Sequence, residues 1–141
     1  CSKNKVIDGL TDNPKDFNGE KRWVIGGYDD GGKLTSGKNR DVDLNWQGDI
    51  KGNYLIPTPK GKTDTQFIND VMDSFNKYKS GSRDWTANPD INDNQGNCNT
   101  LSTGALAGAG VPVKSISAID PNGINWGLGK PLPEMLRKNQ E

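Results

Sequence analysis

Six apolar side chains between Phe67 and Tyr78 recur at helical spacing, and this pattern constrains the fold more than any other feature. Residues three and four apart share one face of a helix, so these side chains form a single apolar stripe. Thr63 or Asp64 can cap the start of the helix, and Ser80-Gly81 ends it. Only 30% of the residues are hydrophobic, so we expect the whole stripe to lie in a lean core. Its members are Phe67, Ile68, Val71, Met72, Phe75 and Tyr78.

A second helix is predicted from Thr100 to Ala109, built mainly from small residues and ended by Gly110. Gly104 and Gly108 lower its helix propensity but allow a neighbouring backbone to approach closely. We therefore expect this helix to pack tightly against another element.

Short strands are expected on both sides of the helices. Residues 22–25 form a strand candidate that stops at the next two glycines, and residues 29–32 are read as a turn. Apolar and polar side chains alternate over residues 42–46, which is typical of a half-buried strand. Residues 54–56 follow as a strand closed by prolines, giving an antiparallel meander, and residues 111–119 are expected to add one more strand.

These elements predict one α+β domain, in which a small antiparallel sheet packs against two helices. The 141 residues suffice for one domain with a real core. We expect an irregular arm over 1–21, a core over 22–133 and a polar tail over 134–141. Residues 81–97 form a long polar loop, and long ordered loops are often functional.

Charge and residue counts exclude several function classes. Basic and acidic residues balance at 18 each, so no net field attracts nucleic acid or anionic membranes. Because the chain has no histidine, a Ser-His-Asp or Cys-His catalytic group cannot be complete within it. Two cysteines are too few for the usual four-ligand structural zinc site, and no apolar run approaches the ~20 residues of a transmembrane helix. We expect no cofactor and no metal.

The first residue, Cys1, admits three interpretations. It could be the acylated cysteine of a bacterial lipoprotein, which would make it a lipid anchor. It could form a disulfide with Cys98, or it could mark an arbitrary fragment boundary. The disulfide would leave Cys98 without a thiol.

Cys98 is the first candidate for chemistry because it directly precedes the second helix. A helix N-terminus favours the thiolate form of a cysteine, and its free amides can receive an oxyanion. A buried inert thiol or a disulfide is the alternative interpretation.

The segments around this helix resemble a known family. Asn97-Cys98-Asn99-Thr100, a helix, residues 109–112 and then residues 126–133 are similar to C-terminal domains of RHS-repeat and filamentous-haemagglutinin-type bacterial proteins. These domains in turn resemble circularly permuted papain-like domains, in which a strand histidine precedes the cysteine helix. Residues 22–25 stand at that strand position without a histidine. The resemblance covers roughly residues 22–133, and only its C-terminal part carries specific motifs.

The resemblance implies an exported bacterial protein, secreted or delivered at the cell surface, and often a toxin of interbacterial competition with a cognate immunity protein. In a papain-like hydrolase of this kind Cys98 would be the nucleophile, with backbone amides near Asn99 and Thr100 stabilising the oxyanion. The base would be a carboxylate, Asp90 or Asp93 being nearest in sequence. The candidate catalytic set is Cys98, Asn97, Asn99, Thr100, Asp90 and Asp93.

A histidine-free ribonuclease toxin is the second interpretation. Basic and aromatic residues gather near the end of the first helix, and such a cluster can bind RNA. A solvated helix end is the alternative, since cations there suit the helix dipole. The RNA-binding set is Lys77, Tyr78, Lys79, Arg83 and Trp85.

A catalytically inactive binding domain, or a lipoprotein that acts only by binding, is the third interpretation.

The spacing Asp90-x-Asn92-x-Asn94-x-Gly96 resembles the first half of a calcium loop. However, Leu101 stands where the bidentate glutamate is expected, so an Asx-rich turn is the better interpretation.

Overall fold

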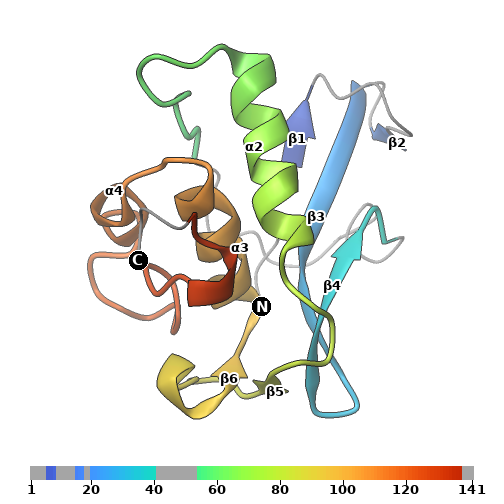
Figure 1. Ribbon diagram of the computed structural model, residues 1–141, viewed down its shortest axis with the longest axis vertical. Helices are drawn as coiled ribbons and strands as arrows, with labels where there is room; N and C mark the ends of the chain where they lie inside the picture. Colours follow the sequence, from blue (N-terminus) through green and yellow to red (C-terminus); the bar gives the residue numbers. More distant parts are fainter. Residues whose placement is uncertain (1–5, 9–14, 18–19, 41–53, 138–141) are drawn as a thin grey trace.

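The computed structural model describes residues 6–8, 15–17, 20–40 and 54–137. Within these ranges the fold is α+β, as predicted, with helices packed against a sheet (Figure 1). The strands are β1 (Val6–Asp8), β2 (Lys15–Phe17), β3 (Glu20–Asp30), β4 (Lys33–Lys38), β5 (Asp84–Trp85) and β6 (Gln95–Gly96). Their order in the sheet is β1-β3-β4-β5-β6, and β2 also pairs with β3. The sheet is mixed rather than wholly antiparallel, because β5 and β6 pair in parallel.

A long hairpin forms the centre of the sheet. It joins β3 (Glu20–Asp30) to β4 (Lys33–Lys38). Gly31 and Gly32 make its turn with φ of +61° and +87°, the left-handed region that two-residue hairpin turns favour. The predicted turn is therefore confirmed, but the strand does not stop at Gly26-Gly27, since both glycines pair with β4.

The short strands lie on either side of this hairpin. Both β1 (Val6–Asp8) and β2 (Lys15–Phe17) pair antiparallel with β3. The N-terminal arm is therefore not wholly irregular. On the other side, β5 (Asp84–Trp85) and β6 (Gln95–Gly96) extend the sheet from β4.

The two predicted helices are both present. Thr63 caps α2 (Asp64–Asn76) through a reciprocal capping box with Gln66, and the apolar stripe faces the core. The second helix, α3 (Cys98–Gly108), begins two residues earlier than predicted, because Asn97 is its N-cap.

Two predicted strands are wrong. Residues 54–56 pair with no strand among the described residues and have no regular secondary structure. Residues 111–119 contain the short helix α4 (Val113–Ser117), which follows Pro112 directly. Proline is favoured at the start of a helix, and here it outweighs the apolar pattern from which a strand was predicted. The strand predicted over 42–46 lies outside the described residues.

The core extends into the segment predicted to be a polar tail. Met135 is wholly buried in the one-turn helix η2 (Pro133–Met135), and Leu136 packs against the core. The close approach expected at the small residues of α3 is present: a Cβ on Gly108 would lie 2.1 Å from Ser74 Oγ and 2.4 Å from the carbonyl oxygen of Met135. Within the described ranges no helix has the length and apolarity to cross a bilayer.

Candidate functional site

The start of α3 is fixed by Asn97, which joins three parts of the chain. Its Oδ1 accepts the backbone N–H of Thr100 at 2.9 Å, while Thr100 Oγ1 accepts the backbone N–H of Asn97 at 2.9 Å. Its Nδ2 donates to the carbonyl oxygens of Ala87, at 3.1 Å, and Trp126, at 2.8 Å. Asn99 Nδ2 donates to the same Trp126 oxygen at 3.0 Å. The polar side chains of this motif therefore hold loops in place.

Cys98 is disulfide-bonded and its side chain is wholly buried. The only other cysteine in the sequence is Cys1, which lies outside the described residues. A sulfur held in a disulfide cannot attack a substrate, because the thiolate is the nucleophile. In this state the helix start presents no reactive group.

The strand facing Cys98 packs closely on the start of α3. Gly27 of β3 lies directly against Cys98, and a Cβ at this position would come within 3.2 Å of Cys98 Cα and 3.0 Å of Leu34 Cδ1. A base must reach hydrogen-bond distance of the nucleophile, and Gly27 has no side chain that could serve as one. The close packing of β3 on α3 also explains why a glycine lies within this strand.

The remaining members of the predicted catalytic set have structural contacts. The Thr100 amide, proposed as an oxyanion donor, is occupied by Asn97 Oδ1. Asp90 caps the one-turn helix η1 (Ile91–Asp93) by accepting the Asn92 N–H at 2.9 Å. No hydrogen bond joins Asp90 or Asp93 to Cys98 in the part of the chain that the structure describes. The structure therefore places Asn97, Asn99 and Thr100 with Cys98 at the start of α3, but among the described residues it shows no hydrogen bond between Cys98 and either aspartate.

The Asp90–Gly96 spacing is an Asx turn, as interpreted from the sequence. Asn94 adopts a left-handed conformation with φ of +55°, which closes the turn. No group of three or more His, Cys, Asp or Glu side chains that could hold a metal ion occurs among the described residues.

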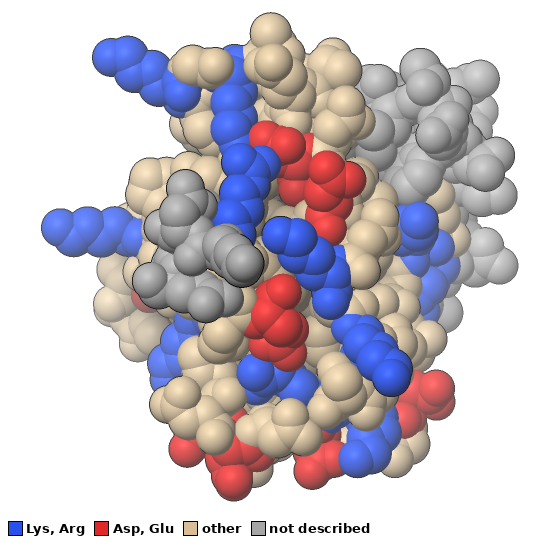
Figure 2. All heavy atoms as spheres, viewed as in Figure 1, with Lys and Arg blue, Asp and Glu red and all other residues tan. Residues whose placement is uncertain are grey.

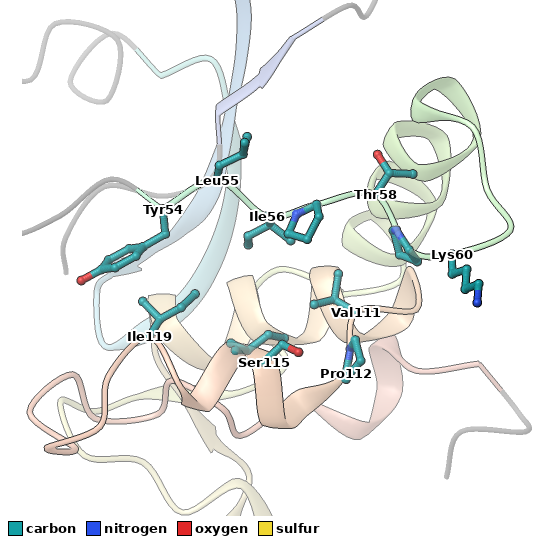
Figure 3. A pocket seen from close by; sticks show the side chains of 12 residues that line it. Tyr54, Leu55, Ile56, Thr58, Lys60, Val111, Pro112, Ser115 and Ile119 are labelled. Carbon is teal, nitrogen blue, oxygen red and sulfur yellow. The ribbon is translucent and has the colours of Figure 1, made fainter.

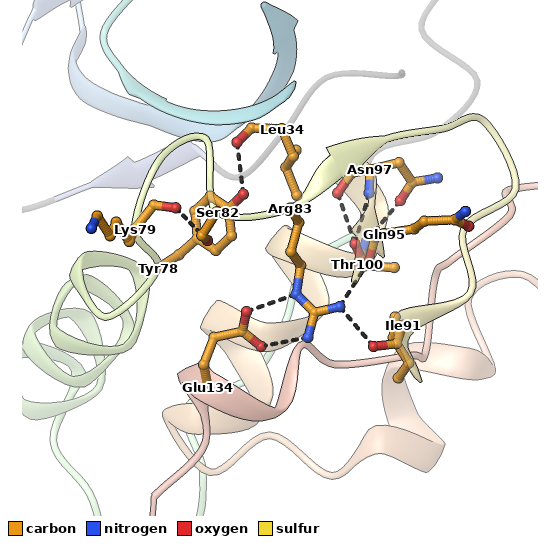
Figure 4. A network of polar contacts seen from close by, with 10 residues as sticks. All are labelled: Leu34, Tyr78, Lys79, Ser82, Arg83, Ile91, Gln95, Asn97, Thr100 and Glu134. Carbon is orange, nitrogen blue, oxygen red and sulfur yellow. Dashed lines mark hydrogen bonds and ion pairs between the residues drawn. The ribbon is translucent and has the colours of Figure 1, made fainter. Parts of the chain in front are cut away.

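The predicted RNA-binding set is divided between surface and core, and Figure 4 shows three of its members, Tyr78, Lys79 and Arg83. Tyr78 is buried and its hydroxyl donates to the Leu34 carbonyl oxygen at 2.6 Å. Burial raises the pKa of Tyr78. Trp85 is half-buried and packs against the core. Lys77 and Lys79 remain exposed at the end of α2.

Arg83 is also a core residue. Its guanidinium forms a bidentate pair with Glu134, at 2.7 and 2.9 Å, and donates to the carbonyl oxygens of Ile91 and Gln95 at 2.7 and 2.9 Å. Burial alone would raise the pKa of Glu134, but the hydrogen bonds from Arg83 hold it below its ordinary value. This side chain is not available to a phosphate group.

Charges on the surface are mixed rather than gathered. Lys and Arg side chains alternate with Asp and Glu over the face drawn in Figure 2. Single-stranded nucleic acid is usually bound by a continuous basic groove with aromatic platforms. This face therefore does not resemble an RNA-binding surface.

An apolar hollow lies elsewhere and was missed by the sequence analysis. Residues 54–60 run across α4 and leave an apolar groove of about 460 Å³ between them (Figure 3). Val111, Ile116 and Ile119 line its α4 side. The signal in the sequence was the apolar run Tyr54–Ile56, but it was interpreted as a strand closed by prolines.

Comparisons with known protein families, with curated proteins and with solved structures found no match to this chain.

Proposed function

We propose that this chain is a non-catalytic binding domain of an exported bacterial protein, and that Cys98 is a structural half-cystine. One observation carries the proposal: Cys98 is disulfide-bonded, wholly buried and packed against Gly27. A cysteine hydrolase needs an accessible thiolate with a base beside it. The disulfide and the burial of Cys98 argue against the first requirement, and among the described residues neither Asp90 nor Asp93 is hydrogen-bonded to Cys98, which argues against the second.

The disulfide also supports export. Disulfides persist in secreted, periplasmic and cell-surface proteins, and they are rare in the reducing cytosol. The resemblance of residues 97–100 and 126–133 to C-terminal domains of RHS-repeat proteins suggests the same location. We propose Cys1 as the partner of Cys98. In that case the sulfur of Cys1 could not also carry a lipid anchor. In this context the binding partner is a target protein or a cognate immunity protein.

Thiol reactivity tests the proposal directly. The protein as isolated should resist iodoacetamide and gain the mass of two hydrogen atoms on reduction. After reduction under native conditions, Cys98 should react with iodoacetamide more slowly than glutathione at neutral pH, because its side chain is wholly buried. The denatured, reduced protein is the control for reagent access. Alkylation of the native protein faster than glutathione would indicate an activated nucleophile and contradict the proposal.

A growth assay separates binding from catalysis. The chain is exported to the periplasm of a bacterial host, alongside a Cys1→Ser/Cys98→Ser variant whose fold is checked by circular dichroism. A growth defect caused by binding should persist in the folded variant. Loss of the defect despite a retained fold would support the hydrolase interpretation instead.

A further inference from the structure

We propose that the groove between residues 54–60 and α4 binds an extended apolar peptide segment of a partner protein. The segment would add a strand beside Tyr54–Thr58, and Lys60 would receive a carboxylate at one end of it. This inference rests on the binding function proposed above, and it specifies the surface and the chemistry of the partner.

The groove exposes apolar side chains that folding alone does not bury. Leu55 is 96% exposed and Tyr54 59% exposed. In Figure 3 Tyr54 points toward Ile119 and Ile56 points toward α4, whereas Leu55 points away from the helix. The volume of about 460 Å³ lies within the range of natural ligand pockets. Contiguous exposed apolar surface of this kind often marks an interaction site.

The backbone beside the groove belongs to no described strand, and the hydrogen-bonding groups of residues 54–58 are open within the described part of the chain. The backbone N–H groups of Tyr54, Leu55 and Ile56 have no hydrogen-bond acceptor among the described residues. Successive residues of an extended chain present their N–H and C=O groups to opposite edges. Because prolines occupy positions 57 and 59, the edge formed by Tyr54, Ile56 and Thr58 keeps all its donors. Proline in a strand is tolerated where its position faces away from the pairing edge.

This edge favours a peptide over other apolar ligands. Strand addition gains affinity from backbone hydrogen bonds, and pockets for alternate side chains provide specificity. The edge of Tyr54, Ile56 and Thr58 supplies the backbone groups, and the apolar lining beside it supplies side-chain contacts. A lipid or another small apolar molecule would leave the backbone groups unused.

Charge at one end of the groove specifies the partner further. Lys60 is exposed and forms no ion pair with the described carboxylates. The neighbouring Lys62 is already engaged, because its Nζ donates to Asp70 at 2.7 Å and to the carbonyl oxygen of Ala109 at 2.6 Å. Lys60 is therefore the cation available to the occupant. An apolar strand that ends in or flanks an acidic residue matches this arrangement.

A phage-displayed library of random ten-residue peptides tests the proposal on the 141-residue chain with its disulfide intact. Recovered peptides are then synthesised, and their affinities are measured by fluorescence anisotropy. We expect apolar residues at alternate positions with a flanking Asp or Glu. Ser115→Trp, which fills the groove from the exposed side of α4, should weaken binding at least tenfold. Lys60→Gln should weaken it about threefold, while the matched control Lys79→Gln at the end of α2 should leave it unchanged.

Backbone pairing is tested with N-methylated versions of the same peptides. Methylation at every second residue removes the backbone N–H donors on one edge of the peptide and blocks that edge. The affinity should therefore fall at least tenfold when either the odd-numbered or the even-numbered residues are methylated, but not for both sets. Equal affinity of both methylated sets would overturn strand addition. Recovery of no peptide whose binding depends on Ser115 would overturn the groove as the site. A wild-type dimer that becomes monomeric on Ser115→Trp, seen by sedimentation, would assign the groove to a second copy instead.

The two proposals fail in different ways. Cleavage of a bound peptide, seen by mass spectrometry and lost in the Cys1→Ser/Cys98→Ser variant, would refute the non-catalytic function but keep the groove. Absence of groove-dependent peptides, together with an inert Cys98, would refute the groove but keep the binding function.

Discussion

Arg83 connects parts of the chain that are distant in sequence. Its side chain is only 9% exposed, and that of its partner Glu134 is 35% exposed. It joins the loop after α2 to the C-terminal η2 and also satisfies two carbonyl oxygens of the 91–95 turn. The Glu134 carboxylate and the carbonyl oxygens of Ile91 and Gln95 therefore share one guanidinium as donor (Figure 4).

Arg83→Met should lower the free energy of unfolding by about 2–4 kcal/mol at pH 7, because it leaves a carboxylate and two carbonyls without a donor. The pKa of Glu134 is lower in the folded protein, so the pair stabilises the fold above the ordinary glutamate pKa. That contribution is lost as pH falls through the folded pKa. The effect of the substitution should therefore shrink as the pH of the urea melts falls below the ordinary glutamate pKa.

The matched control for Arg83 is an exposed ion pair. Lys33 and Asp84 lie 2.5 Å apart, with 55% and 59% of their side chains exposed. Lys33→Met should cost less than about 1 kcal/mol. Equal losses for the two substitutions would show that Arg83 has no special structural role.

At the scale of elements, local signals in the sequence identified both long helices. The residues of the α2 stripe and the Thr63 cap lie within one short segment of the sequence, and so do the residues of the Asn97–Thr100 capping box. The strands depend instead on distant partners: Lys15–Phe17 is a strand only because β3 lies beside it. Likewise, Tyr54–Ile56 has strand-forming residues but no partner among the described strands.

The candidate site was harder to predict than the helices, because its properties are set by contacts across the fold. Cys98 was found from its place before a helix, but its burial depends on Gly27, many residues earlier. Arg83 looks like a surface cation in the sequence, and only Glu134 explains why it is buried. No local pattern contains either pair.

The packing of α2 on α3 gives an element-scale prediction. Gly108→Ala should destabilise the protein by about 1–3 kcal/mol, because the added methyl group would meet Ser74 and the Met135 backbone. This loss should exceed the gain of about 1 kcal/mol in helix propensity. Asn69→Ala, exposed on α2, is the control and should be neutral or slightly stabilising in thermal melts. A Gly108→Ala protein as stable as wild type would contradict the tight contact.

At the scale of the whole molecule, the core is small, so we expect a covalent link to contribute much to the free energy of unfolding. A disulfide between Cys1 and Cys98 would close a loop of nearly 100 residues, for which loop-closure entropy gives about 4–5 kcal/mol. Reduction followed by alkylation, or the Cys1→Ser/Cys98→Ser variant, should therefore lower the free energy of unfolding by several kcal/mol in guanidinium melts. The two routes should agree, because each removes the same constraint on the unfolded chain. Unchanged stability by both routes would mean that the disulfide does not hold the domain together.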